Sequence, residues 1–506
     1  MNIASFLQHW RIEENPFRAE EARHDAVFAR LDQAAVAHPD FEKVVGDLSR
    51  PSTSIVFGEK GAGKTAIRLQ LAERVAAFNE KHPASKLLLV AYDDLNPFLD
   101  RLLSRLRPVK PGSTDDTVQR LKSIKLTDHF DAILHLSTVR VIDLLLLGED
   151  GREAHVKALR AAEPSLRLDA QILQALYDRA EGYELRANEL RGRARVPISR
   201  YRRLWRSLAT FGWILPLVTA VLALTVPRDI IPAGVWLYAL IGAAVVWGGL
   251  AAKWFLWDAW MLRRRAGRIV RAMRTVPRVV ETLAAALERI DPADLAAASL
   301  PEDDSDEKRY AHTARLKRLL RLMGYTGLIV IIDRVDEPTA VNGNVEAMRA
   351  IIWPLLHNKF LQQDGLGLKL LLPAELRHEV LRESSTFFQE ARLDKQNFIE
   401  RLTWTGAALY DMCNARLNAC RQPGADSVSL TDLFEPEVTR QDLVDSLDQM
   451  RQPRDAFKLI YQCLQEHCSN VTIDQERWRI PRLILESVRK QQADRVQMLQ
   501  RGYRPA

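Results

Sequence analysis

Eight residues between positions 58 and 65 have the types and the spacing that a phosphate group needs. Gly58-Glu59-Lys60-Gly61-Ala62-Gly63-Lys64-Thr65 matches the phosphate-loop pattern GxxxxGK[ST] at every fixed position. The glycines let the chain turn back on itself, so that successive backbone N–H groups point into one concavity at a helix N-terminus. We predict that Lys64 reaches the β- and γ-phosphates and that Thr65 binds Mg²⁺. The sequence therefore predicts a nucleoside triphosphate site whose contacts run from Gly58 to Ala66.

A second segment, about 270 residues further along the chain, supplies carboxylates. The apolar run Leu328–Ile332 has the composition of a buried strand and leads into Asp333-Arg334-Val335-Asp336-Glu337. An Asp at the carboxyl end of such a strand holds Mg²⁺ beside a phosphate loop, so Asp333 joins Thr65 as a predicted metal ligand. Asp336 and Glu337 are both candidates for polarising the attacking water, and their spacing does not separate them. The alternative is a core strand that ends in a solvated acidic turn.

Arg454 is a candidate for a further contact to the nucleotide. It follows Pro453, and proline is typical of the first turn of a helix. An arginine at that position leans over the nucleotide from a helical lid, or it is an ordinary surface side chain; the sequence leaves both open. Beyond residue 400 the chain is predicted to be helical, at Phe398–Leu417, Arg440–Met450, Asp455–Cys468 and Pro481–Gln500.

The elements around these residues predict an α/β fold. Ser54–Phe57 is a short apolar strand that enters the phosphate loop, and apolar residues recur at helical spacing after the loop. Lys86–Tyr92 and Leu366–Leu372 are further apolar runs, which are typical of parallel strands buried on both faces. We therefore predict a P-loop NTPase with a parallel sheet, interrupted by a helical insert and a two-helix transmembrane hairpin and followed by a helical C-terminal lid.

Two long uncharged segments interrupt the α/β pattern. Leu208–Val226 holds nineteen residues and Ile230–Ala252 holds twenty-three, and each is long enough for a helix across a hydrocarbon core of about 30 Å. Pro227-Arg228-Asp229 predicts a short turn between them. Arginine clusters lie before the first segment and after the second, so the positive-inside rule predicts a multi-pass protein of the plasma (inner) membrane with both termini in the cytoplasm. The alternative is a buried helical hairpin in a soluble protein.

The net charge of +7 is concentrated beside these two segments. Residues 184–206 carry +6 and residues 253–278 carry +7, which leaves −6 for the rest of the chain. A nucleic-acid-binding face needs basic residues spread over it, so this distribution argues against nucleic acid as a partner. The chain of 506 residues exceeds one ordinary domain. Its four cysteines form no CxxC pair, and we expect buried free thiols.

The insert and the hairpin separate the two halves of the predicted core. Within the insert we expect one long helix from Leu168 to Arg193, and after the hairpin a solvated acidic loop at 301–307. The predicted regions are an N-terminal helical segment (1–48), the first half of the NTPase core (49–113), a helical insert (114–199), the transmembrane hairpin (200–265), a helical return (266–322), the second half of the core (323–400) and a helical lid or C-terminal domain (401–506).

This arrangement resembles the KAP P-loop NTPases, whose members carry transmembrane segments inside the NTPase domain. The resemblance lies in the phosphate loop, the acidic strand and the hairpin between them. The stretch 333–337 also resembles the DGhDE form of the NACHT and wider STAND group, but Arg334 stands where those relatives have a small or acidic residue. Pro453-Arg454 resembles the lid arginine of AAA+ and STAND ATPases. The resemblance implies an additional-strand ATPase that acts as a regulated switch or assembly platform, linked in bacteria to phage exclusion, other defence or signalling.

Together the residues and the resemblance predict a membrane-anchored ATPase switch. The expected cofactors are ATP and Mg²⁺, although no residue separates ATP from GTP. The expected partners are membrane lipid and a protein, either a different one or a second copy of the chain. A non-hydrolysing membrane scaffold that binds nucleotide is the main alternative, and a DNA-handling ATPase is a further one that the charge distribution disfavours. Hydrolysis needs positioning and charge neutralisation more than covalent chemistry, and the loop and acidic residues suffice for it.

Overall fold

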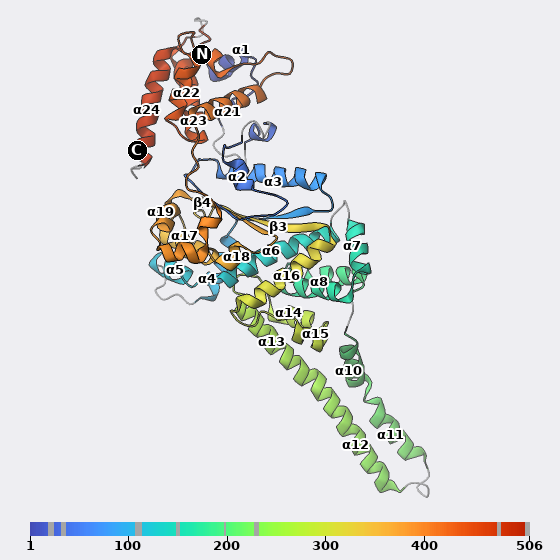
Figure 1. Cartoon of the computed structure of the whole chain (residues 1–506). Coiled ribbons are helices and arrows are strands. Elements are labelled where there is room, and N and C mark those ends of the chain that lie inside the picture. The colour runs from blue at the N-terminus through green and yellow to red at the C-terminus, as the bar shows by residue number, and fades with distance from the viewer. Residues whose placement is uncertain are drawn as a thin grey trace. The chain divides into compact units, whose positions relative to one another are not determined.

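The computed structural model describes residues 1–18, 25–31, 37–106, 114–147, 152–196, 199–226, 232–472 and 477–500. The chain divides into two compact units (Figure 1). The first contains residues 1–94 and 327–506, and the second contains residues 95–326. The second unit is therefore an insertion into the first. The predicted first half of the core runs to residue 113, whereas the N-terminal part of the first unit ends at Asp94.

The first unit is built on one sheet with the strands β1 (Ser54–Gly58), β2 (Lys86–Tyr92), β3 (Tyr325–Ile332), β4 (Leu366–Pro373) and β5 (Asn397–Ile399). Their order across the sheet is β2-β3-β4-β1-β5. β1 pairs in parallel with β4 and β5, and β3 pairs in parallel with β4. Every residue of β1 and β4 is buried, because central parallel strands are covered on both faces. The predicted α/β fold with a parallel sheet is confirmed.

β5 corrects one prediction. The sequence predicts a helix from Phe398 to Leu417, but residues 397–399 pair with Ser54–Val56 of β1. The helix of this region, α21 (Gly406–Ala419), begins only after Thr405, whose side chain accepts a hydrogen bond from the backbone N–H of Ala408. A three-residue strand is too short to show a periodicity of two, so its pairing with β1 is visible only in the folded chain.

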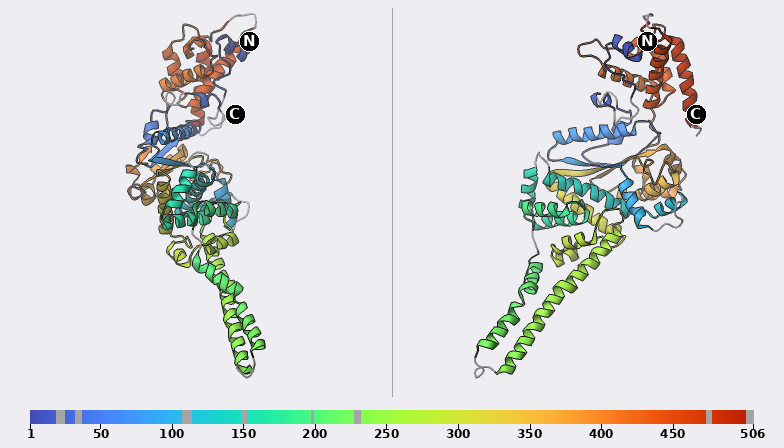
Figure 2. Two further views of the ribbon diagram at one scale, coloured as in Figure 1. Left: turned by 90° about the vertical axis from the view of Figure 1, so that its right-hand side faces the viewer. Right: turned by 180° about the vertical axis from the view of Figure 1, so that it is seen from behind.

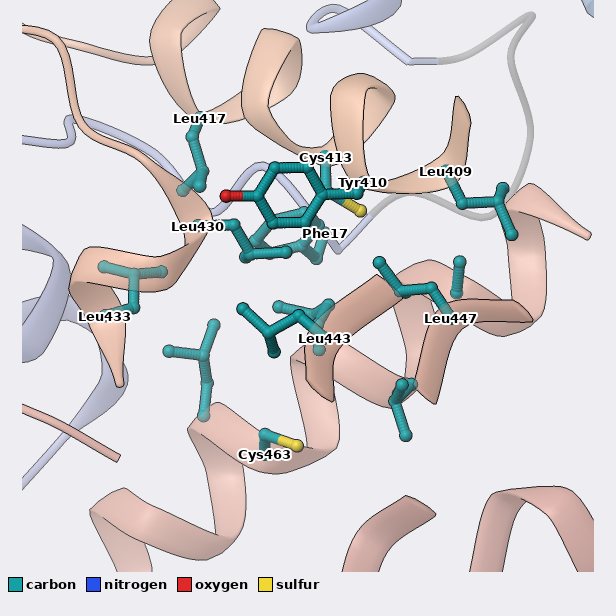
Figure 3. Close-up of a cluster of buried hydrophobic side chains, with 14 of the residues drawn as sticks. Phe17, Leu409, Tyr410, Cys413, Leu417, Leu430, Leu433, Leu443, Leu447 and Cys463 are labelled. Carbon is teal, nitrogen blue, oxygen red and sulfur yellow. The ribbon is translucent and has the colours of Figure 1, made fainter. Parts of the chain in front are cut away.

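Both ends of the chain contribute to one helical core of the first unit. Phe17 from the N-terminal segment packs with Tyr410, Leu443 and their neighbours from the C-terminal helices (Figure 3). Phe6 belongs to the same cluster. The described residues of the predicted N-terminal helical segment up to Leu31 therefore share this core with the C-terminal helices, while residues 41–48 pack against the sheet. All four cysteines are buried free thiols, as predicted.

The helices of the first unit surround this sheet and this core. They are α1 (Ile3–His9), η2 (Phe28–Arg30), α2 (Phe41–Val45), α3 (Lys64–Lys81), α17 (Val345–Ile352), η4 (Trp353–Leu355), α18 (Asn358–Leu361), α19 (Ala374–Leu381), α20 (Ser385–Ala391), η5 (Leu393–Lys395), α21, η6 (Leu430–Leu433), α22 (Arg440–Asp448), α23 (Pro453–Asn470) and α24 (Arg482–Gln500).

The described part of the second unit is helical, as predicted for the insert and the return. Its helices are α4 (Asn96–Arg105), α5 (Thr114–Leu121), α6 (Leu126–Leu146), α7 (Arg152–Ala161), α8 (Pro164–Tyr177), α9 (Tyr183–Ala194), α10 (Arg200–Phe211), α11 (Ile214–Thr225), α12 (Ala233–Ala251), η3 (Ala252–Asp258), α13 (Ala259–Ala272), α14 (Val280–Glu288), α15 (Pro292–Ala297) and α16 (Asp306–Leu322).

The single helix predicted from Leu168 to Arg193 is two helices. α8 ends at Tyr177 and α9 begins at Tyr183. Gly182 has a φ of 66°, a left-handed conformation that glycine adopts without steric cost. Because the chain turns at this break, the guanidinium group of Arg186 in α9 lies 2.9 Å from the buried carboxylate of Asp178.

A buried ion pair joins helices of the second unit. Asp131 of α6 and Arg309 of α16 lie 3.0 Å apart, and neither side chain is exposed. The Tyr177 hydroxyl of α8 donates a hydrogen bond to Asp131 at 3.1 Å. Burial raises the pKa of Asp131 to about 6, although Arg309 acts in the opposite direction. Removing one partner of such a pair leaves a buried charge without compensation, so the pair ties three helices together.

The two apolar segments form helices whose surface is not buried in this chain. The helical stretches Arg200–Thr225 and Ala233–Ala272 are long and apolar enough to cross a membrane, and 6% and 0% of their most apolar windows are buried. α11 and α12 lie side by side (Figure 2), and the Trp247 indole donates to the Ala209 carbonyl at 3.1 Å. The two helices are therefore not buried within this chain, as the alternative of a buried helical hairpin would require. The predicted turn at 227–229 lies outside the described residues.

Candidate functional site: a phosphate-loop cleft

One cleft of the first unit is lined by residues from four separate parts of the sequence. They are the N-terminal segment, the phosphate loop with the start of α3, the segment that follows β3, and the C-terminal helical region, which is the predicted lid. β1 delivers the loop from the middle of the sheet, and α3 begins at Lys64, directly after it. Gly61 and Gly63 have φ values of 102° and 97°, which residues with a side chain rarely adopt. The glycines of the motif therefore stand where the backbone of the loop requires them.

Lys64 lies folded over its own loop. Its ammonium nitrogen donates to the carbonyl oxygens of Gly58 at 2.6 Å and Glu59 at 3.1 Å. Burial lowers the pKa of Lys64, and the nearby carboxylates, Asp333 foremost, act in the opposite direction. Within the described chain this part-buried ammonium group donates only to two carbonyl oxygens, which phosphate oxygens can replace.

Asp333 is the most deeply buried acid of the cleft. It follows the last residue of β3, and it is 1% exposed. One carboxylate oxygen accepts a hydrogen bond from the backbone N–H of Arg334 at 2.9 Å, but the other has no hydrogen-bond partner among the described residues. Burial raises the pKa of Asp333, with the amide of Arg334 and the charge of Lys64 acting in the opposite direction. The cleft thus holds a buried carboxylate oxygen that nothing in the described chain satisfies.

The sheet sets the distance between Lys64 and Asp333. β4 lies between β1 and β3, with Leu370 paired to Ile55 on one side and to Ile332 on the other. Neighbouring strands are about 4.8 Å apart, so one intervening strand leaves room for a phosphate and a metal ion between the phosphate loop and the acid.

Asp336 and Glu337 both line the cleft, but their surroundings differ. Glu337 has an exposed side chain, and its carboxylate pairs with the Arg334 guanidinium at 3.3 Å. Asp336 is partly buried and is among the carboxylates that raise the pKa of Lys64. Arg334 has a φ of 59°, so the chain turns at this residue and carries both acids past the end of the strand. In this conformation the charge of Asp336 acts on Lys64, whereas the carboxylate of Glu337 is paired with Arg334.

The lid reaches the phosphate loop through Arg454. A Cβ atom on Gly61 would lie 3.0 Å from the Cβ of Arg454, so the loop and the start of α23 are in close contact. The charge of Arg454 is one of the influences that lower the pKa of Lys64, after burial. Its Nε is buried without a partner among the described residues. The structure therefore brings the predicted lid arginine to the loop, rather than leaving it on the surface.

Trp404 is a site residue that the sequence analysis missed. Its indole N–H donates to the carbonyl of Ala62 at 2.9 Å, inside the loop, and its ring packs by Gly63. Gln452 donates to the Glu59 carboxylate, which also pairs with Arg401 at 2.8 Å. A single tryptophan between a strand and a helix has no sequence pattern that marks it, so only the fold shows this contact.

The far end of the cleft is apolar and closed by a buried ion pair. Arg416 and Asp25 lie 2.6 Å apart, both almost fully buried. The apolar side chains at this end come from the N-terminal segment and the lid, namely Phe28, Leu31, Met412 and Phe457. A flat apolar ring such as a nucleobase suits this end, because small-molecule pockets combine apolar walls with a few polar groups.

The donor set of the cleft fits Mg²⁺ bound together with a nucleotide. Among the described residues no group of three or more His, Cys, Asp or Glu could hold a metal ion. Mg²⁺ at phosphate sites is held by one or two side chains together with phosphate oxygens and water. Thr65 and Asp333 line the same cleft, and the free oxygen of Asp333 is of the type that Mg²⁺ prefers. The residues present therefore fit the ion.

Comparison with protein-family models, with curated proteins and with solved structures gives no match.

Changing Lys64 tests the phosphate loop. We expect Lys64→Ala to lose detectable ATP binding, because it removes the side-chain charge aimed at the terminal phosphates. Lys60→Ala is the matched control, since Lys60 is exposed and its contribution to the loop is its backbone N–H. Binding of a fluorescent ATP analogue to detergent-solubilised protein measures the difference, with circular dichroism as the check on folding. Undiminished binding by a folded Lys64→Ala variant would refute the site.

The three acids are expected to have separable roles. Asp333→Asn should weaken Mg²⁺-dependent ATP binding as well as turnover. Glu337→Gln should bind ATP like the parent and slow single turnover by about 10²–10⁴, because a positioned base acts on the rate. Asp336→Asn is the competing variant, and Glu390→Gln, at an exposed position outside the cleft, is the control. If Glu337→Gln turns over normally while Asp336→Asn does not, the base is Asp336.

Proposed function

We propose that this chain is a membrane-anchored P-loop ATPase that acts as a nucleotide-dependent switch or assembly platform. One observation carries the proposal: Lys64 and Thr65 at the start of α3 share a cleft with Asp333, whose buried second oxygen has no partner among the described residues. Leaving a buried carboxylate oxygen unsatisfied costs free energy, so such an oxygen in a cleft points to a ligand.

The residues of the cleft have distinct parts in this proposal. The loop amides and Lys64 bind the phosphates, and Lys64 exchanges the Gly58 and Glu59 carbonyls for phosphate oxygens. Thr65 and Asp333 hold Mg²⁺, which neutralises charge on the phosphates when it is bound. Asp336 or Glu337 orients the attacking water. For Glu337 this requires its carboxylate to leave Arg334.

The lid supplies the switch. Trp404, Gln452 and Arg454 contact the loop from elements that follow β5, so a phosphate in the loop alters the surroundings of all three. A ligand shifts a conformational equilibrium only by binding two states differently, and groups that touch the loop directly can provide that difference. The apolar end of the cleft supports a purine nucleotide, and we propose ATP.

The strand order supports an additional-strand ATPase. β4, which follows β3 in the sequence, lies between β3 and the loop-bearing β1. The second unit enters the chain between β2 and β3 and carries the two apolar helices, which is the arrangement that the KAP resemblance implies. We therefore propose membership of that group, with a protein or a second copy of the chain as the partner of the lid.

The exposed apolar helices support anchoring in the plasma (inner) membrane. Both are long enough to cross it, and side chains such as Leu224 and Tyr238 are 87% and 77% exposed. Arginines lie at the outer ends of both helices, so we propose a hairpin with both chain termini in the cytoplasm.

A non-hydrolysing nucleotide-binding scaffold is the second candidate. The observation in its favour is the Arg334–Glu337 pair, which holds one of the two candidate bases at an exposed position.

Turnover on solubilised protein distinguishes the two functions. We expect Mg²⁺-dependent ATP hydrolysis that rises when the partner is present, and nucleotide-dependent protection of α23 from hydrogen exchange. Arg454→Gln should bind ATP but lose that protection, whereas Arg451→Gln, at an exposed position three residues earlier, should keep it. Tight binding without turnover, under all conditions, would favour the scaffold.

Cysteine labelling tests the hairpin. A cysteine at position 230 should react with a membrane-impermeant reagent in intact cells, and one at position 150 should not. The parent provides the background, because its four cysteines are buried. The opposite labelling pattern would refute the proposed orientation.

A further inference from the structure

A basic cleft lies in the second unit where the apolar helices join the rest of that unit. Five basic side chains line it, from α10, η3 and α13: Arg202, Lys253, Arg264, Arg265 and Arg268. Two carboxylates, Asp258 and Glu302, face them, so the cleft carries a formal charge of +3. It is separate from the phosphate-loop cleft, which belongs to the first unit.

Among the described residues, two arginines of this basic cleft take no part in its ion pairs. Asp258 pairs with Lys253 at 3.1 Å. Glu302, in the acidic loop that we expected to be only solvated, pairs with Arg265 and, at 2.7 Å, with Arg268. Arg202 donates its Nε to the carbonyl of Ile290, and the carboxylates of Glu288, Asp258 and Asp291 act on its charge without forming an ion pair with it among the described residues. Arg264 stacks on Trp260 at 5.3 Å.

A π-helical turn shapes one wall of the basic cleft. Residues 252–258 form the π-helix η3 in the middle of a long helix. In an α-helix, residues five apart point to different sides, whereas the i→i+5 pattern of a π-helix brings them to the same side. This turn lets Lys253 meet Asp258 while also lying 4.2 Å from the Trp205 ring of α10. The carboxylate of Asp258 is thereby paired with Lys253 rather than with Arg202 or Arg264.

The basic cleft adjoins a strongly apolar surface. Next to it, an open groove is lined by Phe255, Leu256, Trp257 and Trp260, and all four side chains are at least half exposed. Aromatic side chains of this kind lie at the level of lipid headgroups, and basic pockets at the cytoplasmic ends of membrane helices bind anionic headgroups. A ligand with a phosphate and an acyl chain would match the cleft and the groove together.

We infer that this basic cleft binds the phosphate of an anionic phospholipid from the cytoplasmic leaflet, with Arg202 and Arg264 as the phosphate ligands and the aromatic groove as the acyl-chain contact. The inference rests on the proposed membrane anchoring but not on nucleotide binding or hydrolysis. The guanidinium groups donate to the phosphate oxygens in the forked geometry that suits them. Phosphatidylglycerol offers this chemistry, whereas phosphatidylcholine carries a neutral headgroup.

Native mass spectrometry of the full chain in detergent tests the inference. Phosphatidylglycerol and phosphatidylcholine with identical acyl chains are added separately, and the retained lipid is counted. We expect one phosphatidylglycerol retained about tenfold more than phosphatidylcholine, and a loss of about tenfold in Arg202→Gln/Arg264→Gln. Arg203→Gln/Arg271→Gln is the matched control: it removes the same charge from exposed positions of α10 and α13 outside the basic cleft, and should retain the lipid like the parent.

Each other outcome has a definite meaning. Equal retention of the two lipids, or equal loss in the control variant, would overturn the inference, because retention would then follow overall charge. Displacement of phosphatidylglycerol by millimolar inorganic phosphate, with no effect of the acyl chains, would make this a phosphate site and overturn the lipid assignment. Recovery of the parent in the soluble fraction without detergent would instead refute the membrane anchoring on which the inference rests.

Discussion

Asp333 is a carboxylate that the protein buries at the end of a central strand while leaving one oxygen without a hydrogen bond from the described chain. Burial of an unsatisfied polar group costs free energy, and burial of a charge costs more. The nearby charge of Lys64 offsets part of that cost, and a bound cation would offset the rest. The strand order, the glycines with positive φ and the folded side chain of Lys64 all shape the cleft in which this carboxylate lies.

The position of the second unit imposes a constraint of its own. β2 and β3 are neighbours in the sheet, yet residues 93–324 separate them in the chain. A disordered segment of that length would add loop-closure entropy to the cost of pairing the two strands. The described part of the insert is instead a folded helical unit, tied together by the buried Asp131–Arg309 pair and the Tyr177 hydroxyl. An insert that folds on its own core can carry the apolar helices without disturbing the sheet.

The lid depends on both ends of the chain. The N-terminal amino group donates to the carbonyls of Cys468 and Val471, and Ile12 bridges to Arg421. The same lid places Trp404 and Arg454 on the phosphate loop. The loop therefore contacts a helical core that is built from residues about 400 positions apart in the sequence.

The sequence alone determined the features whose signals are local. The phosphate loop is a strand, a turn and a helix start within about a dozen residues. Its glycines mark positions where the backbone adopts a positive φ, which residues with a side chain rarely do. Four of the five strands are apolar runs of sufficient length, and the two apolar helices exceed the length needed to cross a membrane, a test that needs no tertiary context. Asp333 could be placed at a strand end because a buried run stops there.

Only the tertiary structure decided the contacts between distant segments. The three residues of β5 read equally well as a helix start, and their pairing with β1 settles them. Three contacts leave no periodic pattern in the sequence: the hydrogen bond from Trp404 to the Ala62 carbonyl, the ion pair of Glu337 with Arg334, and the packing of the N-terminal segment against the C-terminal helices. The physical reason is that a periodic pattern records which face of an element is buried, whereas the partner that covers that face depends on how the whole chain packs.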